Sequence, residues 1–306
     1  MPSVDDIRGM FVPVPTPFTL DGDLDEAMFA EMVNHYIEVG GNAMFLFGSV
    51  GQGASMPITM RKRALEVALE AAANRVPVVP NVGTVDPFSG RELGIHAREH
   101  GATAVGLVGP YYYSDRSTEE LIAHVKMVDD ATQLPLFIYN NPAYQGYSIE
   151  PAAMARIRDA VPNMFGLKIA KGGINDILRY QTAMGRDFKL FAPQENLFPG
   201  MLIGQAGSVS PPLAMAMEVG VAFVRAIDAG DHEEALRLQI ALYDFAQSLA
   251  KLHKFGRTVQ FEGLKYAGFD LKMYPRWPTV PLTTDALSDL HDCIDRVRSS
   301  VAVGVR

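Results

Sequence analysis

The sequence contains a single cysteine, Cys293, among its 306 residues. One cysteine excludes an intrachain disulfide, which is typical of proteins from a reducing compartment. No apolar run approaches the roughly 20 residues that a transmembrane helix needs. Residues 1–6 also lack the basic segment that opens a signal peptide. We therefore expect a cytoplasmic protein with no membrane partner.

Positive charge is also scarce. Lys and Arg total 27 against 35 Asp and Glu, so the formal net charge is −8. The longest basic cluster is the triplet Arg61-Lys62-Arg63, which we interpret as the solvated face of a helix start. Proteins that bind nucleic acids present a basic patch or stripe, so no nucleic-acid partner is expected.

Hydrophobic residues make up 48% of the chain, enough for a large core. Short β-rich runs alternate with stretches of helical periodicity, which favours parallel βαβ units. The strand candidates are Met10–Val14, Ala43–Phe47, Pro77–Val82, Thr103–Val108, Pro135–Tyr139, Met164–Lys168, Lys189–Ala192 and Gly207–Ser210. Eight parallel βα units close into a (β/α)8, or TIM, barrel.

The barrel is predicted over residues 1–225. Residues 226–306 carry helical periodicity, and we interpret them as a C-terminal helical extension packed on the barrel within the same domain. At the first helix, Asp23 followed three residues later by Glu26 predicts an N-cap and its partner.

Lys168 lies near the C-terminal end of the apolar run Met164–Ala170. Burying an ammonium group is costly. In one interpretation the side chain extends from the strand end to water. In the other, the amine is desolvated and its pKa is lowered, so that the neutral form can attack a carbonyl carbon. The run by itself leaves both interpretations open.

The active site of such a barrel lies where the strands end. The residues there are Thr16, Ser49, Tyr111, Tyr112, Tyr139, Lys168, Gln194, Glu195, Gly207 and Ser208. An amine, phenols, hydroxyls and backbone donors suit Schiff-base formation with a 2-oxo acid: the amine attacks the ketone, a phenol moves protons, and hydroxyl and amide donors hold the carboxylate. The set contains no pair of nearby carboxylates and no metal cluster, so no metal is expected.

Four motifs occur in order at the ends of the second, fourth, fifth and sixth strands: Gly48-Ser49-Val50-Gly51, Pro110-Tyr111-Tyr112, Tyr139-Asn140-Asn141-Pro142 and Gly166-Leu167-Lys168. With them the chain resembles, over essentially its whole length, the dihydrodipicolinate synthase / N-acetylneuraminate lyase family of class I aldolases. The resemblance implies that Lys168 forms the Schiff base without any other cofactor and that Tyr139 relays protons. Ser49 would then lie between these residues and the substrate carboxylate, and Tyr112 would cross a subunit interface in a homodimer or homotetramer. Tyr111 and Tyr113 are expected to be packing residues.

The departures from the family concern substrate binding. Val50 and Gln52 replace a hydroxyl and a carboxylate of the usual loop, so carboxylate binding is expected to rely on Ser49 and backbone N–H groups. Tyr144 stands where the synthases carry an arginine that grips a dicarboxylate partner, which argues against aspartate semialdehyde as second substrate. Glu195 matches the glutamate with which neuraminate lyases bind sugar hydroxyls. The substrate-binding set is Thr16, Val50, Tyr144, Glu195, Gly207 and Ser208.

The predicted function is a Schiff-base lyase, with an aldolase that splits a 4-hydroxy-2-oxo acid or a 2-keto-3-deoxy sugar acid into pyruvate and an aldehyde as the first hypothesis. A dehydratase acting on a 2-keto-3-deoxy sugar acid through the same enamine is the second. A barrel that binds a 2-oxo acid without turnover is the third, and it is motivated by the polar groups lost at Val50 and Gln52.

Two patterns are set aside. His96-Ala97-Arg98-Glu99-His100 fits the zinc pattern H-x-x-E-H, but it falls on the helix after the third strand, on the outer ring of the barrel. Lys171 lies three residues beyond Lys168, beside two glycines, and is expected to be exposed in a loop.

Overall fold

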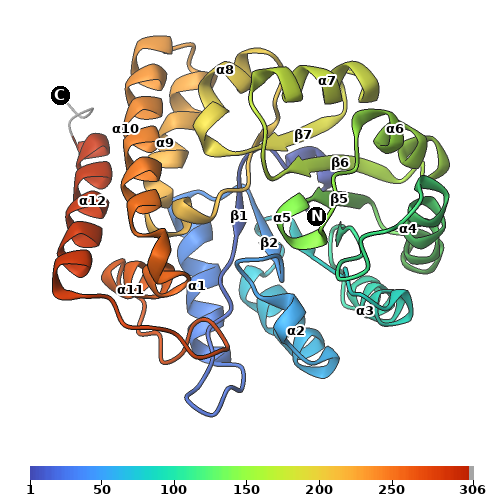
Figure 1. The fold of residues 1–306 in the computed structure, drawn as a ribbon, viewed down its shortest axis with the longest axis horizontal. Helices are drawn as coiled ribbons and strands as arrows, with labels where there is room; N and C mark the ends of the chain where they lie inside the picture. The colour runs from blue at the N-terminus through green and yellow to red at the C-terminus, as the bar shows by residue number, and fades with distance from the viewer. Residues whose placement is uncertain (303–306) are drawn as a thin grey trace.

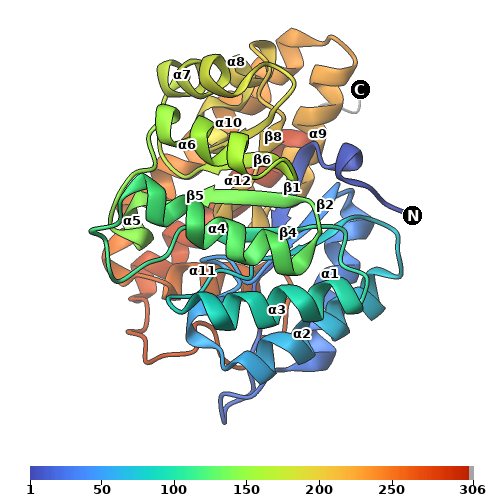
Figure 2. The same cartoon turned by 90° about the vertical axis from the view of Figure 1, so that its right-hand side faces the viewer.

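The computed structural model describes residues 1–302 and shows eight parallel strands surrounded by helices (Figures 1 and 2). The strands are β1 Gly9–Pro13, β2 Ala43–Leu46, β3 Val78–Pro80, β4 Val105–Val108, β5 Leu136–Asn140, β6 Met164–Ile169, β7 Lys189–Ala192 and β8 Gly207–Ser208. Their order is β3-β2-β1-β8-β7-β6-β5-β4. The barrel closes between β3 and β4 by a parallel bridge from Asn81 to Gly106 and by the Val82 amide, which donates to the Gly106 carbonyl at 2.7 Å. The predicted (β/α)8 barrel is confirmed.

The helices form the outer ring and the C-terminal part of the molecule (Figure 1). Their bounds are α1 Glu26–Val39, α2 Ile58–Ala72, α3 Pro87–Glu99, α4 Thr118–Thr132, α5 Pro142–Gln145, α6 Pro151–Ala160, α7 Ile174–Met184, α8 Leu197–Leu202, α9 Met217–Asp228, α10 His232–Lys251, α11 Thr258–Tyr266 and α12 Thr284–Ala302. Side-chain caps begin several of them; Ser117 and Glu120, for example, form a capping box at α4. Among the described residues no helix is long and apolar enough to cross a membrane.

The N-cap of α1 differs from the prediction. The helix begins at Glu26, and the Asp25 carboxylate accepts the Met28 amide at 3.1 Å. Asp23 lies earlier, in a tight turn where its carbonyl accepts the Thr19 amide at 2.8 Å. The capping prediction was therefore wrong by two residues, because a cap is defined by where the chain enters helical geometry and not by residue type alone.

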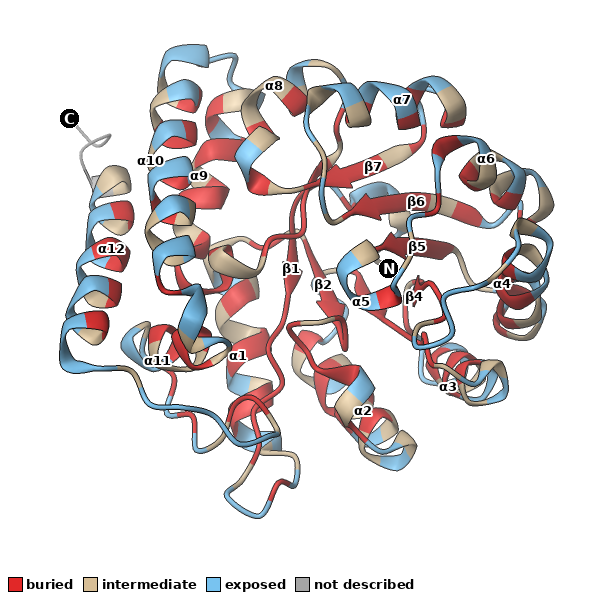
Figure 3. Ribbon diagram, viewed as in Figure 1, coloured by how far each residue is buried: buried red, intermediate tan, exposed pale blue. Residues whose placement is uncertain are grey.

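Aromatic side chains fill the interior of the barrel. The Phe11 ring packs edge-on against Phe45, Phe137 and Phe191, with ring centroids 5.3 to 5.5 Å apart. Edge-to-face contacts of this kind are favourable for buried aromatic rings. Phe45 also meets the ring of Tyr139 at 6.0 Å and 90°, so this packed layer supports one side of the site. Figure 3 shows the strands buried and the outward faces of the helices exposed.

The chain after α11 returns to the loop that follows β2. Met273 pairs with Phe18 in an isolated bridge. The Arg276 amide donates to Gln52 Oε1 at 2.7 Å, and its guanidinium donates to the Ser55 carbonyl at 2.9 Å. These contacts hold the segment 273–277 against the loop that follows β2, so residues far apart in sequence jointly shape the mouth of the barrel.

Candidate active site

Lys168 and Tyr139 face each other at the ends of neighbouring strands. Lys168 is paired with Tyr139 in the register of β5 and β6. The lysine is only 5% exposed, and its Nζ lies 4.4 Å from the centroid of the Tyr139 ring. Of the two interpretations that the sequence left open, the structure favours the desolvated amine.

The electrostatics of this pair follow from its burial. Desolvation lowers the pKa of the Lys168 amine, and the nearby Tyr139 phenol opposes that change only in part. Burial acts to raise the pKa of Tyr139, but the charge of Lys168 and hydrogen bonds from Ser49 and Asn141 outweigh it, so the phenol pKa lies below its ordinary value. Each group therefore comes closer to exchanging protons near neutral pH than it would in water.

Two polar side chains position the Tyr139 hydroxyl. Asn141 Nδ2 donates to it at 2.6 Å, and the Ser49 hydroxyl lies 3.3 Å away. The Asn141 backbone amide in turn donates to Gln145 Oε1 at 3.2 Å. Asn141 was not among the predicted site residues, although it belongs to the motif Tyr139-Asn140-Asn141-Pro142.

The loop after β2 carries Ser49 in an uncommon backbone conformation. Phe47 has a φ of 57°, a left-handed value that a bulky residue rarely adopts. Asn81 Nδ2 donates to the Phe47 carbonyl at 3.0 Å. Buried Arg61 in turn donates to the carbonyls of Asn81 and Gly83. The interpretation of Arg61 as part of a solvated face was wrong, because its position on α2 faces the barrel and its guanidinium satisfies loop carbonyls there.

A cavity of about 320 Å³ opens above Tyr139. This volume suits a small-molecule ligand. Its lining is mostly apolar and aromatic and consists of Phe47, Gly48, Ser49, Gln52, Ala54, Ser55, Asn81, Gly83, Val108, Tyr111, Tyr139, Tyr144, Arg257 and Trp277. Tyr111, expected to be a packing residue, is thus part of the cavity wall.

The predicted residue Tyr144 lies at this cavity together with a cation that the sequence did not reveal. Arg257 Nη2 donates to the Tyr144 hydroxyl at 2.7 Å, and Arg257 Nη1 donates to Gln260 Oε1 at 3.0 Å. Trp277 completes the same wall. Arg257 and Trp277 belong to the C-terminal extension, and no local motif marks them, since only the folded chain brings them to the mouth.

Several predicted substrate-binding residues have protein partners. The Thr16 hydroxyl is fully buried and donates to the Gly51 carbonyl at 2.7 Å. The buried Ser208 hydroxyl donates to the Ala192 carbonyl at 3.0 Å. The Val50 side chain is buried, and its carbonyl accepts the Tyr274 hydroxyl at 3.1 Å. In this structure these contacts stabilise the loop and the strand ends.

The other predicted residues, Gly207, Glu195 and Tyr112, do not line this cavity. Gly207 pairs with Gly9 in β1, and a Cβ at this position would meet the Gly9 carbonyl oxygen at 2.1 Å, so the close approach of the two strands requires glycine. Glu195 is exposed at the end of β7. Tyr112 is 81% exposed, with a φ of 76°, and its ring meets that of Tyr113.

A buried lysine facing a phenol at the mouth of a (β/α)8 barrel is an arrangement that suits a lyase of the class I aldolase type, an enzyme that works through a lysine Schiff base. Residues 6–297 match the Dihydrodipicolinate synthetase family. The chain belongs to that family.

Individual relatives agree with this assignment. The 4-hydroxy-tetrahydrodipicolinate synthase of Agrobacterium fabrum is 32% identical over 234 residues, which cover 76% of this chain and 79% of the relative. The synthase of Thermus thermophilus is 30% identical over 244 residues, covering 79% and 81%. Among solved structures, YagE of E. coli K12 in complex with pyruvate superposes with a TM-score of 0.89 and 25% identity, covering 95% of this chain and 99% of YagE. A sialic acid aldolase of Ruminococcus gnavus, at 19% identity, shares the fold with a TM-score of 0.89 over 99% of each chain.

Proposed function

We propose that this protein is an aldolase that joins pyruvate to an aldehyde, or cleaves the corresponding 4-hydroxy-2-oxo acid, through a Schiff base on Lys168. The observation that carries the proposal is the contact between the buried Lys168 amine and the Tyr139 ring, with Ser49 and Asn141 at the phenol oxygen. A lowered lysine pKa increases the fraction of neutral amine that can attack a ketone.

The chemical steps follow from these positions. The Lys168 amine attacks the ketone carbon, and the resulting carbinolamine loses water to form an iminium. Tyr139 supplies and removes the protons of these steps, because its hydroxyl both donates and accepts. Loss of a proton from the adjacent carbon gives an enamine, whose carbon attacks the aldehyde. The aldehyde oxygen takes up a proton, and water hydrolyses the new iminium to release the 4-hydroxy-2-oxo acid and the free Lys168 amine. Ser49 lies beside the phenol and is positioned to hold the substrate carboxylate or to pass a proton.

Borohydride trapping with pyruvate tests the Schiff base. We expect a reduced adduct on Lys168, located by peptide mapping, and its loss in Lys168→Ala. The matched control is Lys171→Ala, which removes an exposed lysine three residues away and should trap as the parent does. A parent protein that forms no adduct with pyruvate or with larger 2-oxo acids would refute the proposal.

The second substrate is proposed to be an aldehyde that carries an anionic group and an apolar or aromatic body. Tyr144 cannot form an ion pair with an anionic substrate, but the guanidinium of Arg257 beside it can. Each terminal nitrogen of Arg257 uses one N–H group to bond Gln260 or Tyr144 and has a second N–H group for a substrate. The aromatic lining of the cavity, including Trp277, suits a flat or apolar substrate body. In this proposal Arg257, which belongs to the C-terminal extension, recognises the second substrate. Residue 144, where the synthases carry an arginine, does not supply that charge.

Assembly is proposed to involve Tyr112. Its ring is exposed and its backbone is held in a left-handed conformation, which costs free energy in isolation. Contact with a second subunit in a homodimer or homotetramer would offset that cost. Size-exclusion chromatography with light scattering should show an oligomer, and Tyr112→Phe should lower turnover within an intact assembly. A fully active monomer is the outcome that contradicts this role.

A further inference from the structure

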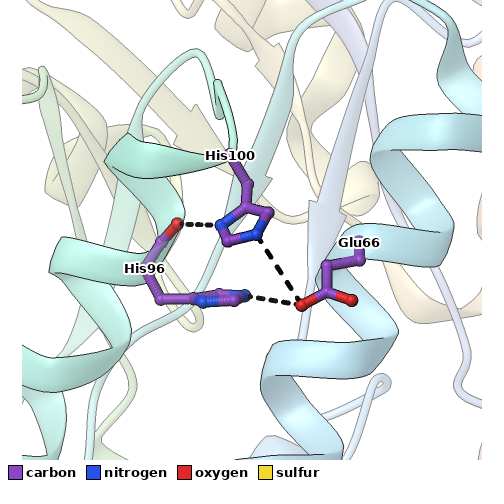
Figure 4. A group of neighbouring side chains, drawn as sticks. All are labelled: Glu66, His96 and His100. Carbon is purple, nitrogen blue, oxygen red and sulfur yellow. Dashed lines mark hydrogen bonds and ion pairs between the residues drawn. The ribbon is translucent and has the colours of Figure 1, made fainter.

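Three potential metal ligands meet between α2 and α3, on the outer surface of the barrel. Figure 4 shows the imidazole rings of His96, in the last turn of α3, and of His100, the C-cap residue of that helix, both turned toward Glu66 of α2. His96 Nε2 lies 3.3 Å from Glu66 Oε1, and His100 Nε2 lies 3.8 Å from the same oxygen. All three ligand atoms lie within 4.8 Å of one another. Glu99, which completes the sequence pattern H-x-x-E-H, is not the carboxylate of this group.

The hydrogen bond of His100 leaves an electron pair directed at the centre of the group. His100 Nδ1 lies 2.9 Å from the His96 carbonyl, and a carbonyl can only accept, so Nδ1 carries the proton. In the neutral ring Nε2 then presents a lone pair to the Glu66 carboxylate. A backbone carbonyl that orients the far nitrogen of the ring is a common feature of histidine metal ligands.

The remaining contacts hold Glu66 and pair the nearby positive charges with carboxylates. Arg63 Nη1 bonds the other Glu66 oxygen, Oε2, at 3.0 Å, which leaves Oε1 for the histidines. The Lys62 ammonium is paired with Glu92 at 2.6 Å. His96 Nε2 also lies 3.3 Å from the Lys62 carbonyl, so metal binding through Nε2 would require this ring to carry its proton on Nδ1 instead.

The separations fit a tetrahedral ion. Bonds of about 2.0–2.1 Å to nitrogen and oxygen place tetrahedral ligand atoms roughly 3.3 Å apart. The His96 distance to Glu66 Oε1 matches this value at 3.3 Å, and the His100 distance of 3.8 Å would shorten when an ion binds. Imidazole and carboxylate donors suit zinc. His100 is exposed, so solvent can reach a fourth position. We propose that Glu66, His96 and His100 form a Zn²⁺ site, with water as the fourth ligand, that links α2 to α3.

The proposed site is structural and not part of the aldol chemistry. Helix α3 follows β3, so it starts near the mouth of the barrel. Its last turn, which carries His96, and the C-cap residue His100 lie toward the opposite end. A bound ion would tie two adjacent helices of the barrel wall together. Because the ion binds the folded arrangement and not the separated ligands, it should stabilise the native state.

Metal titration of the full chain, stripped first with a chelator, tests the proposal. With Zn²⁺ in calorimetry we expect one ion per chain, and with Co²⁺ the visible absorption of a tetrahedral N/O site. Glu66→Gln, His96→Gln and His100→Gln should each weaken Zn²⁺ binding by at least ~10-fold. Removing a residue that only hydrogen-bonds a metal ligand already costs about that much, and these variants remove a ligand itself. Zn²⁺ should raise the midpoint of thermal unfolding of the parent but not of these variants.

Glu99→Gln is the matched control, because it changes the exposed glutamate of the same sequence pattern and should bind Zn²⁺ as the parent does. Circular dichroism on each variant checks that the fold is kept. Two outcomes would overturn the proposal. In the first, the parent binds no Zn²⁺ at micromolar concentrations, so the three groups share only a proton. In the second, Zn²⁺ binds but none of the three ligand variants weakens the binding.

Discussion

Replacing Arg257 by methionine tests how the second substrate is recognised. The guanidinium is already held by Gln260 at 3.0 Å and by Tyr144 at 2.7 Å, so little ordering of the side chain remains when a ligand binds. A hydrogen bond to a charged group contributes about 1.5–3 kcal/mol. Its loss corresponds to a fall of roughly 10–150-fold in kcat/KM for an acceptor that carries a carboxylate.

The assay is condensation of pyruvate with a matched pair of acceptors, benzaldehyde and its carboxylated derivative. For the parent we expect a preference for the carboxylated aldehyde that disappears in Arg257→Met, while benzaldehyde is affected little. Borohydride trapping with pyruvate should be unchanged in this variant, since Lys168 and Tyr139 are intact. That readout separates a failure of acceptor recognition from a failure of the Schiff-base chemistry.

Two further variants refine the result. Arg257→Lys keeps the positive charge but loses the planar, two-pronged donor, so we expect an intermediate preference. Tyr144→Phe removes only the hydroxyl that orients the guanidinium and should cost less than Arg257→Met. An equal loss on both aldehydes in Arg257→Met would falsify specific recognition of the anion and would indicate instead a disturbed wall of the cavity.

The remaining predictions concern the buried charges. Burial lowers the pKa of Lys168, so between that lowered pKa and the ordinary lysine value the unfolded chain binds more protons and stability rises with pH. Lys168→Met should abolish trapping yet raise the unfolding midpoint by roughly 2–4 °C, and a lower midpoint would contradict the desolvation argument. Asn141→Ala removes a hydrogen bond that lowers the pKa of Tyr139, so the alkaline limb of the pH–rate profile should move to higher pH. An alkaline limb that stays in place would show that this hydrogen bond does not set the pKa of the phenol. Arg61→Ala leaves two loop carbonyls unpaired and should lower the free energy of unfolding, measured by urea denaturation, by about 2–4 kcal/mol. A loss below ~1 kcal/mol would mean that water replaces the guanidinium at these carbonyls.

The family assignment narrows the three hypotheses drawn from sequence. A chain that belongs to the Dihydrodipicolinate synthetase family is an enzyme of the class I aldolase type, which argues against a binding barrel without turnover. The choice of acceptor stays with the proposal, and the matched aldehydes address it directly.

Sequence patterns alone determined the barrel and the centre of its site. Eight alternating βα units can bury their strands in few other ways. Because parallel strands all end at one face, Ser49, Tyr139 and Lys168 had to converge once their strands were recognised. The apolar run around Lys168 could not reveal whether the amine is desolvated, since that depends on the neighbouring strand and on the register that sets it against Tyr139.

Only the tertiary structure decided the contacts between residues distant in sequence. Arg257 and Trp277 reach the cavity because the C-terminal extension folds back over the β2 loop, and Glu66 joins His96 and His100 because α2 packs beside α3. Thr16 illustrates the converse, since its hydroxyl is at a strand end as predicted but bonds the Gly51 carbonyl. Local sequence encodes which face of an element is apolar and where strands end, whereas the partner of a polar group is set by packing across the whole chain.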